Sequence, residues 1–266
     1  MKVGVFIGSI TGNTENFAHV IMDELKQLDS TLQFEVYMIN IEMNKKNTKP
    51  DYQYPNCDAY LFGAYADWYT IPVFVRQYLE AMPSTNLSGK YVMTFSTCGS
   101  NMRNMRYVFE KILTEHGALP VTYVSAIYPG NYVHIQMAYA NVVKNQKMID
   151  LKKNCAEFVH ALKTNTYIYT KQSKSCTQGF TDRMQQKAIP IIFKIDSACI
   201  GCGTCVRNCP SGILSIENKR AVFTEQEKCV GCYACFQKCP VHAVVDEKKK
   251  LVKIQQYKFD AKLIKK

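Results

Sequence analysis

The first 165 residues alternate short apolar runs with longer amphipathic segments. The apolar runs predict five buried strands, at residues 3–7, 34–39, 59–62, 91–95 and 121–126. Residues 13–28 and 105–116 place apolar side chains at helical spacing. A further helix is predicted to begin near Pro72, a last one to span about 138–162, and the polar segment 42–56 to hold only a short helix. This alternation predicts an α/β fold with helices covering a parallel sheet.

The alternation stops near residue 163, where Thr, Ser, Lys and Gln become frequent. This composition predicts a linker or docking segment over 166–188, which is either a fixed strap or a hinge. Beyond it the sequence repeats with a period of 30 residues, so that Cys199 matches Cys229. We therefore expect a first domain over 1–165 and a duplicated second domain over 189–266.

Cysteine is the compositional feature that adds most to this picture. The chain has 12 cysteines, and eight of them lie between residues 199 and 239. The N-terminus lacks the basic, apolar and cleavage-site regions of a secretory signal, so we expect a cytoplasmic protein, in which metal or redox chemistry is favoured over disulfides. The apolar runs fall far short of the roughly 20 residues of a membrane span, so none is expected.

The eight clustered cysteines have the spacing C-x2-C-x2-C-x3-C-P twice. In that spacing three thiolates of one run bind one [4Fe-4S] cluster, and the fourth binds the neighbouring cluster. The expected ligand sets are Cys199, Cys202, Cys205 and Cys239 for one cluster, and Cys229, Cys232, Cys235 and Cys209 for the other. Gly201 and Gly231 leave room for the ligand loops. The alternatives are two zinc sites or plain buried cysteines, but zinc would leave the third cysteine and the proline of each run unexplained.

A second candidate site follows the first predicted strand. The segment between that strand and the first helix consists of Ser9, Ile10, Thr11, Gly12, Asn13 and Thr14. Hydroxyl groups and backbone N–H groups at a helix N-terminus can hold a phosphate. The endings typical of a P-loop or a dinucleotide fingerprint are missing. Taken alone, the segment fits a capped helix start equally well.

In its position after the first strand, this segment resembles the FMN phosphate loop of flavodoxins, with a resemblance that spans about residues 1–162. The resemblance implies a flavodoxin-like, doubly wound, five-stranded parallel sheet with FMN at the carboxyl ends of the strands. Two further loops would contact the flavin, through Ala64, Tyr65 and Trp68 after the third strand and Thr97, Cys98 and Gly99 after the fourth. Trp68 suits stacking on the isoalloxazine ring, although a lone loop aromatic is as often a packing anchor.

The chain departs from flavodoxins at the loop after the fourth strand, which has no Tyr to stack on the flavin and leaves one face open near Cys98. The loops are not markedly acidic, which weakens the repulsion of a reduced, anionic flavin. The thiols outside the repeat are expected to be buried or incidental, with Cys98 the exception because the resemblance puts it beside the flavin. They are Cys57, Cys98, Cys155 and Cys176.

The second half resembles bacterial-type two-cluster ferredoxins over about residues 189–253, which implies a small α+β domain. The whole chain resembles flavodoxin/ferredoxin fusion proteins of anaerobic microbes. This resemblance implies electron transfer between an external redox partner, two [4Fe-4S] clusters and FMN. The alternative is a flavin-dependent reductase of a quinone, a nitro compound or free flavin, fed through the clusters. A redox sensor is a third class, which no feature specifically supports, and no residue is assigned a catalytic role.

Charge adds an expectation about partners. The formal net charge is +11, and residues 241–266 hold eight lysines against three acidic residues, a net charge of +5. We expect redox partner proteins, in particular an acidic ferredoxin or oxidoreductase. Nucleic acid is not expected, because no aromatic interleaving or nucleic-acid motif accompanies the lysines.

Overall fold

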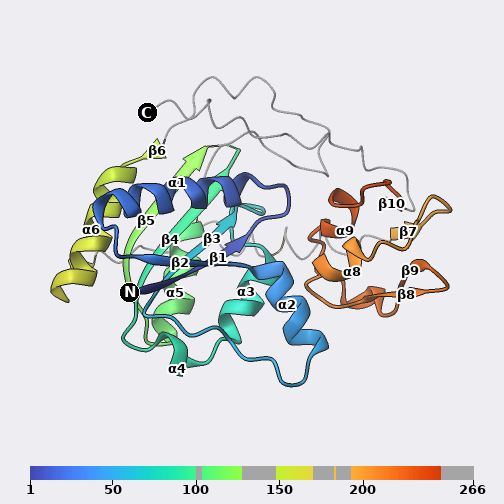
Figure 1. Ribbon diagram of the computed structural model, residues 1–266, viewed down its shortest axis with the longest axis horizontal. Helices are drawn as coiled ribbons and strands as arrows, with labels where there is room; N and C mark the ends of the chain where they lie inside the picture. The colour runs from blue at the N-terminus through green and yellow to red at the C-terminus, as the bar shows by residue number, and fades with distance from the viewer. Residues whose placement is uncertain (100–103, 128–147, 170–182, 184–192, 247–266) are drawn as a thin grey trace.

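A computed structural model describes residues 1–99, 104–127, 148–169, 183 and 193–246. Its N-terminal part is a sheet between two layers of helices (Figure 1). The parallel strands are β1 (Lys2–Gly8), β2 (Gln33–Met38), β3 (Ala59–Tyr65), β4 (Tyr91–Cys98) and β5 (Leu119–Ile127). They pair in the order β2-β1-β3-β4-β5. Because this is the flavodoxin-like order, the predicted fold and its five strands are confirmed.

The sheet has a short additional strand, which corrects one prediction. Strand β6 (Met148–Ile149) pairs antiparallel with β5, and α6 (Leu151–Thr164) begins only after it. The helix predicted over 138–162 is therefore wrong at 148–150, because β6 takes the free edge of β5. Asp150 then adopts a left-handed conformation with φ of 53° directly before the helix. The earlier part of that prediction, up to residue 147, lies outside the described residues.

Helices cover both faces of the sheet because the strands are apolar on both sides. In β1, Val3, Val5 and Ile7 face one core, and Phe6 faces the other. Helices α1 (Asn13–Leu28) and α6 pack on the first face, and the opposite face is covered by α2 (Ile39–Thr48), α3 (Val73–Glu80) and α5 (Met105–Glu115). The helices predicted over 13–28 and near Pro72 are confirmed. Helix α2 begins at Ile39, which we had assigned to the second strand.

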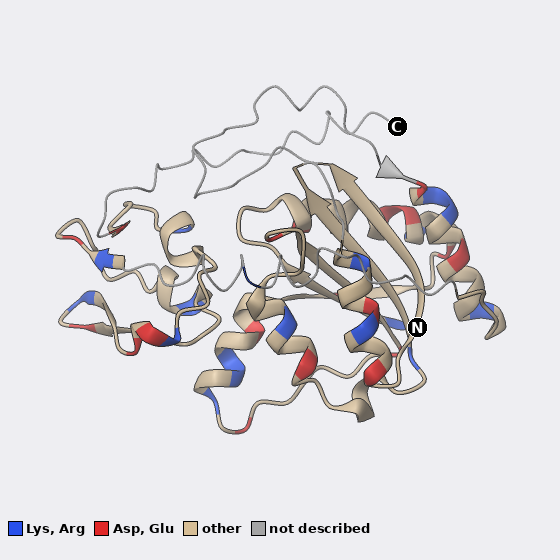
Figure 2. Cartoon of the chain, turned by 180° about the vertical axis from the view of Figure 1, so that it is seen from behind, with Lys and Arg blue, Asp and Glu red and all other residues tan. Residues whose placement is uncertain are grey.

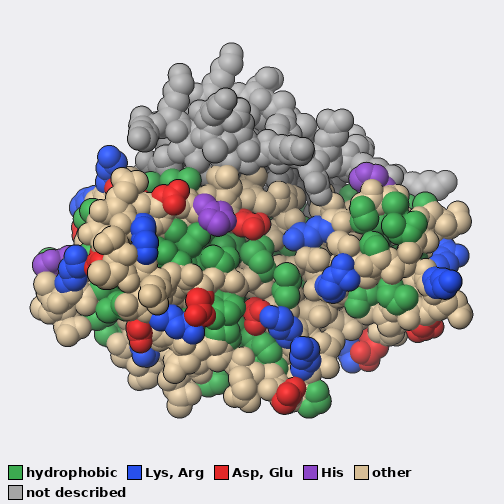
Figure 3. Space-filling model, viewed as in Figure 1, with side chains coloured by type: hydrophobic (Ala, Val, Ile, Leu, Met, Phe, Trp, Pro, Cys, Tyr) green, Lys and Arg blue, Asp and Glu red, His purple; other side chains and the backbone are tan. Residues whose placement is uncertain are grey.

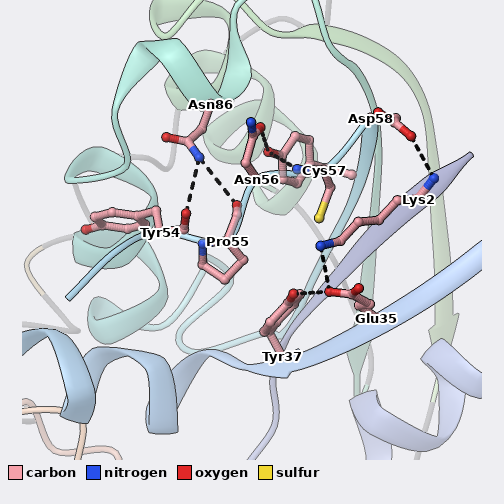
Figure 4. Close-up of polar contacts among 10 residues, drawn as sticks. Lys2, Glu35, Tyr37, Tyr54, Pro55, Asn56, Cys57, Asp58 and Asn86 are labelled. Carbon is pink, nitrogen blue, oxygen red and sulfur yellow. Dashed lines mark hydrogen bonds and ion pairs between the residues drawn. The ribbon is translucent and has the colours of Figure 1, made fainter.

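Polar contacts join the strands at the amino end of the sheet (Figure 4). The backbone N–H of Lys2 donates to the carboxylate of Asp58 at 2.8 Å, and the Lys2 ammonium lies 2.9 Å from the carboxylate of Glu35. The hydroxyl of Tyr37 donates to the same carboxylate. These contacts link β1 to β2 and to the start of β3, and the loops of the candidate flavin site lie at the opposite, carboxyl end.

The C-terminal part is a small α+β domain, as expected. Strand β7 (Phe193–Ile195) pairs antiparallel with β10 (Val244–Asp246), and β8 (Leu214–Glu217) with β9 (Arg220–Phe223). The short helices α8 (Thr204–Asn208) and α9 (Ala234–Gln237) begin 30 residues apart in the two halves of the repeat. The matched residues Phe193 and Phe223 stack with their ring centroids 6.3 Å apart. The sequence repeat is therefore also a structural repeat.

The two parts of the chain meet where α2 lies beside α8, as both cartoon views show (Figures 1 and 2). Most of the segment predicted as a linker, 166–188, lies outside the described residues. Over the described ranges, no helix combines the length and the apolar character that crossing a membrane requires.

Candidate functional site

One pocket of the C-terminal domain brings together cysteines from both halves of the repeat. Among the residues that line it are Cys199, Cys202, Cys205 and Cys239, the four that the spacing assigned to one cluster. Cys202 is exposed, whereas Cys205 and Cys239 are buried. The pocket wall is completed by apolar side chains such as Ile195 and Val244. The four sulfurs thus share one apolar hollow that is open at Cys202.

The other four cysteines form a second, more enclosed group. Burial is the main cause that raises the pKa of Cys232 and Cys235, and the proximity of Cys209 and Cys229 raises it further. Burial disfavours the charged form of a thiol, and iron ions supply the positive charge that makes thiolates favourable in such a place. The donor set therefore suits a metal cluster.

Backbone N–H groups point at several of the sulfurs. Ala221 donates to Cys199 Sγ at 3.4 Å, and Ala243 donates to Cys239 Sγ at 3.1 Å. In the second group, Gly231 donates to Cys229 Sγ at 3.4 Å. Hydrogen bonds of this kind stabilise negative charge on cluster sulfurs and tune the reduction potential.

The exposed Cys202 differs from the buried thiols. Its sulfur lies 3.4 Å from the hydroxyl of Thr204, which lowers the pKa of Cys202 because it can donate to the thiolate. In the described ranges no group of three or more His, Cys, Asp or Glu side chains is placed to hold a metal ion. A cubane makes a different demand, because each cysteine binds a separate iron and the sulfurs need not converge on one point.

Backbone conformation shapes the two ligand loops. Gly201 has φ of 67°, and a Cβ there would lie 2.4 Å from the carbonyl oxygen of Lys219. Gly203 and Tyr233, which match in the repeat, are both left-handed with φ of 72° and 60°. Tyr233 is only 9% exposed and packs edge-on against Phe193. The halves thus share a backbone path but differ in the side chain at this position.

The three loops expected to hold the flavin are brought together at the carboxyl end of the sheet. The hydroxyls of Thr14 and Thr97 are hydrogen-bonded at 2.8 Å, and both residues are buried. The backbone N–H of Ala66 donates to the carbonyl of Thr97 at 2.8 Å. Segment 9–14 is therefore linked to the end of β4, and the end of β4 to the loop after β3.

The N-cap position of α1 is occupied by glycine. This residue, Gly12, has φ of 96° and no side chain that could accept a hydrogen bond from the first turn. The hydroxyl of Ser9 instead accepts a hydrogen bond from the backbone N–H of Gly12 at 3.2 Å. A helix start capped by its own Ser or Thr side chain, the alternative from the sequence, does not describe this arrangement. The N–H groups and the dipole of a helix N-terminus suit an anion.

Trp68 lies at the tip of a tight turn after β3. Asp67 and Thr70 close the turn through two backbone hydrogen bonds of 2.8 and 3.1 Å. Trp68 and Tyr69 both have positive φ, of 50° and 64°. The carbonyl of Tyr69 also accepts a hydrogen bond from the backbone N–H of Asn104 at 3.2 Å. This turn is held in place, and the indole of Trp68 is half-buried.

Three of the four remaining cysteines are buried, as expected. Burial raises the pKa of Cys57 to about 11 and that of Cys155 to about 12. Cys98 ends β4 and is 9% exposed, beside the loop Thr97–Gly99. Cys176 lies outside the described residues.

Sequence reasoning missed three amide side chains on α2. Asn44 Nδ2 donates to the carbonyl oxygens of Val206 at 3.0 Å and Cys209 at 2.8 Å. The other contacts are from Asn40 to the carbonyl and side-chain oxygens of Asn208, at 3.3 and 3.2 Å, and from Asn47 to the carbonyl of Pro210, at 2.8 Å. The available signal was the spacing of three Asn on one face of a helix.

Comparison with known proteins identifies the C-terminal domain. Residues 191–253 match the 4Fe-4S dicluster domain family. No curated protein matches the sequence. Matching solved structures include a flavodoxin from the domain Archaea, at 14% identity over 61% of this chain and 99% of that chain with a TM-score of 0.42. An oxidoreductase from Corynebacterium diphtheriae matches at 12% identity, over 62% and 99% of the two chains, with a TM-score of 0.44.

An NADH:FMN oxidoreductase in its apo form also matches, at 13% identity over 68% of this chain and 98% of that chain with a TM-score of 0.42. The fold assignment of the N-terminal part rests on its strand order rather than on these scores. The chain therefore combines a flavodoxin-like fold with a C-terminal segment that matches the 4Fe-4S dicluster domain family.

Proposed function

We propose that this chain is an electron-transfer flavo-iron-sulfur protein that passes electrons between an external redox partner, two [4Fe-4S] clusters and FMN. The observation that carries the proposal is the union of a flavodoxin-like sheet with a domain whose eight repeat cysteines fall into two groups of four. A flavin passes between one- and two-electron steps, whereas each cluster moves one electron, so the pair joins two kinds of redox chemistry. The domains would span 1–165 and 189–266, joined by 166–188.

Each cluster would be held by cysteines from both halves of the repeat. Three N–H groups, those of Ala221, Gly231 and Ala243, would stabilise the charge on the coordinated sulfurs. Exposed clusters of low potential are damaged by oxygen, so an anaerobic cytoplasm is the setting that we propose.

FMN would lie against the three loops at the carboxyl end of the sheet. Ser9, Ile10, Thr11, Gly12, Asn13 and Thr14 would hold its phosphate, with Ala64, Tyr65, Trp68, Thr97, Cys98 and Gly99 beside the ring. The N-terminus of α1, with glycine at its N-cap, supports this assignment, because its dipole and N–H groups favour an anion. The bond between Thr14 and Thr97 would keep the phosphate loop and the ring loop in register.

Cofactor analysis of protein reconstituted under anaerobic conditions tests the proposal. We expect about eight irons and one FMN per chain, because eight cysteines supply two four-iron sites. The visible spectrum should show both flavin bands and broad iron-sulfur absorption. Protein that holds neither flavin nor iron after reconstitution would overturn the proposal.

A flavin-dependent reductase of a small acceptor is the alternative function. The observation that favours it is the composition of Thr97–Gly99 at the end of β4, which places no aromatic side chain there to cover a flavin. The two functions are distinguished by adding NADH or NADPH, and then a reduced small ferredoxin, to the anaerobic holoprotein. Bleaching of the flavin by pyridine nucleotide alone supports the reductase, and bleaching by reduced ferredoxin alone supports the electron carrier.

A further inference from the structure

We propose that the two clusters have fixed and different places in the electron path. The cluster of Cys209, Cys229, Cys232 and Cys235, called the inner cluster, exchanges electrons with the flavin. The cluster of Cys199, Cys202, Cys205 and Cys239, called the outer cluster, exchanges them with an acidic one-electron carrier protein. This inference rests on the proposed function. It adds the order of the two clusters along the electron path, a docking surface for the partner and a fixed contact between the two parts of the chain.

The first support is the amide clamp, formed by Asn40, Asn44 and Asn47 on α2. These side chains donate to carbonyl oxygens at and just after the C-terminus of α8. One acceptor, 2.8 Å from Asn44, is the carbonyl of Cys209, a ligand of the inner cluster. Helix α2 begins where β2 ends, so the clamp ties an inner ligand directly to the carboxyl end of the sheet.

The second support is apolar packing across the same contact. Ala234 is fully buried within the hydrophobic core that also contains Phe6 and Phe62 of the sheet, and Val230 and Cys232 pack against that core. All three residues belong to the ligand loop of the inner cluster. No residue between Cys199 and Cys205 of the outer loop belongs to that core. The inner loop is therefore the one that faces the flavodoxin-like fold.

The outer cluster has the opposite setting. Every residue that lines its pocket belongs to the C-terminal domain. Cys202 is exposed, and Ile200 in the pocket wall is 63% exposed. Hydrophobic side chains with Lys and Arg between them reach the surface of this domain in the space-filling view (Figure 3). An exposed apolar side chain beside a redox centre is a contact that a partner protein can use.

Basic side chains next to this pocket indicate the charge of the partner. The Arg207 guanidinium donates to the carbonyl of Cys202 at 3.1 Å, and that of Arg220 donates to the carbonyl of Asp196 at 2.7 Å. Both arginines are exposed, as is Lys219 at the turn between β8 and β9. Although Asp196 lies close by, the chain as a whole is strongly basic. An acidic carrier protein is the complementary partner.

Each step of this path would move one electron. The group held by Cys199, Cys202, Cys205 and Cys239 would accept an electron from the reduced partner, and the group held by Cys209, Cys229, Cys232 and Cys235 would pass it to the flavin. Two such transfers, with protons from water, would reduce one flavin. The path runs equally well in reverse when the partner is the acceptor.

The variant Asn44→Asp tests the inner step in the holoprotein. A carboxylate cannot donate to the two carbonyl oxygens and repels them. After flash reduction by photoreduced deazariboflavin, the first-order transfer between clusters and flavin should slow at least about tenfold, because the fixed contact is lost. Hydrogen exchange should rise in peptides from α2 and from 204–210. The matched control is Asn154→Asp, since the side-chain amide of Asn154 donates to the carbonyl oxygen of Asp150, at 2.9 Å, within the N-terminal turn of α6 and away from the contact between the two parts.

The variant Ile200→Glu tests the outer step. A reduced acidic two-cluster ferredoxin serves as the probe, and the second-order rate of its reaction should fall at least about tenfold through like-charge repulsion and loss of an apolar contact. The first-order transfer to the flavin should stay unchanged. Ile216→Glu is the control, because Ile216 is 41% exposed in the same domain but does not line the pocket.

The two variants should therefore separate the two steps. The inference is overturned if Asn44→Asp leaves the first-order rate and the hydrogen exchange unchanged, or if Ile200→Glu slows transfer to the flavin rather than the reaction with ferredoxin. Failure of the proposed function is recognised separately, because the wild-type protein would then lack flavin or iron before any rate is measured.

Discussion

Gly201 illustrates how a single residue sets the path of a ligand loop. Its positive φ is one requirement, which other residues meet at a cost of about 1–2 kcal/mol. Its second requirement is space, because a Cβ would lie only 2.4 Å from the carbonyl oxygen of Lys219. The lack of space for a Cβ distinguishes Gly201 from a glycine in an exposed turn, which needs only the positive φ.

The variant Gly201→Ala should therefore lose the outer cluster more readily than the inner one. We expect iron content to fall from about eight towards about four per chain, with a lower melting temperature. Gly89→Ala is the control, since Gly89 has φ of 71° but nothing within 4 Å of an added Cβ. Equal iron content in the two variants would show that the Lys219 backbone can move away from the added Cβ without loss of the cluster.

The buried thiol of Cys57 should react slowly with iodoacetamide in the folded protein. Burial raises the pKa of Cys57 to about 11 from a usual value of 9.0, which lowers the reactive thiolate at pH 8 about a hundredfold. The rate should rise about tenfold per pH unit up to about pH 11, whereas in urea it should level off above pH 9. Peptide mass spectrometry measures both profiles, and a folded protein that reacts as fast as the unfolded chain would contradict the burial.

At the scale of elements, α2 shows where the sequence was least informative. Its sequence, with Asn40, Asn44 and Asn47 among several charged residues, has no clear apolar stripe, so only a short helix was expected around it. The helix forms because it packs on the sheet through Ile39 and Met43 and binds carbonyl groups from a distant segment. Both interactions are tertiary, and periodicity within one segment cannot reveal them.

The loops at the carboxyl end of the sheet give an element-scale prediction. Thr97→Val removes the partner of the fully buried Thr14 hydroxyl, which should cost about 1–3 kcal/mol and weaken FMN binding about tenfold or more. Thr94→Val on the same strand is the control, because among the described residues the Thr94 hydroxyl is buried with no hydrogen-bond partner. Fluorescence titration of apoprotein with FMN measures both affinities. Equal losses in the two variants would argue against the role of the Thr14–Thr97 bond.

At the scale of the whole molecule, the sequence was most informative where patterns repeat. The five strands follow from apolar runs, and the cysteine spacing grouped the same four sulfurs that line the outer pocket. The start of α6 was wrong because the strand pairing of Met148–Ile149 depends on the free edge of β5. Neither the apolar runs nor the cysteine spacing carries information about contacts between the two parts of the chain. The sequence therefore left open whether segment 166–188 is a fixed strap or a hinge.

Charge gives a prediction for the whole molecule. Two clusters at about −2 each and an FMN phosphate at about −2 leave the +11 chain near +5. The reaction with a reduced acidic ferredoxin should therefore slow as NaCl rises from about 50 to about 500 mM, because salt screens the attraction. Stopped-flow measurement of the second-order rate tests this. A rate that rises with salt would show that the acidic partner binds to a negatively charged surface of this protein.

The difference between Gly203 and Tyr233, which match in the repeat, bears on the proposed transfer of electrons through the C-terminal domain. If the two halves of the repeat were identical, the two proposed clusters would have equivalent surroundings, and an electron could leave through either one. Here one half carries a bare glycine at the turn, and the other carries a ring that packs against Phe193. On the proposed electron path, this difference would make the surroundings of the two clusters unequal, so that a partner and the flavin would each meet a different one.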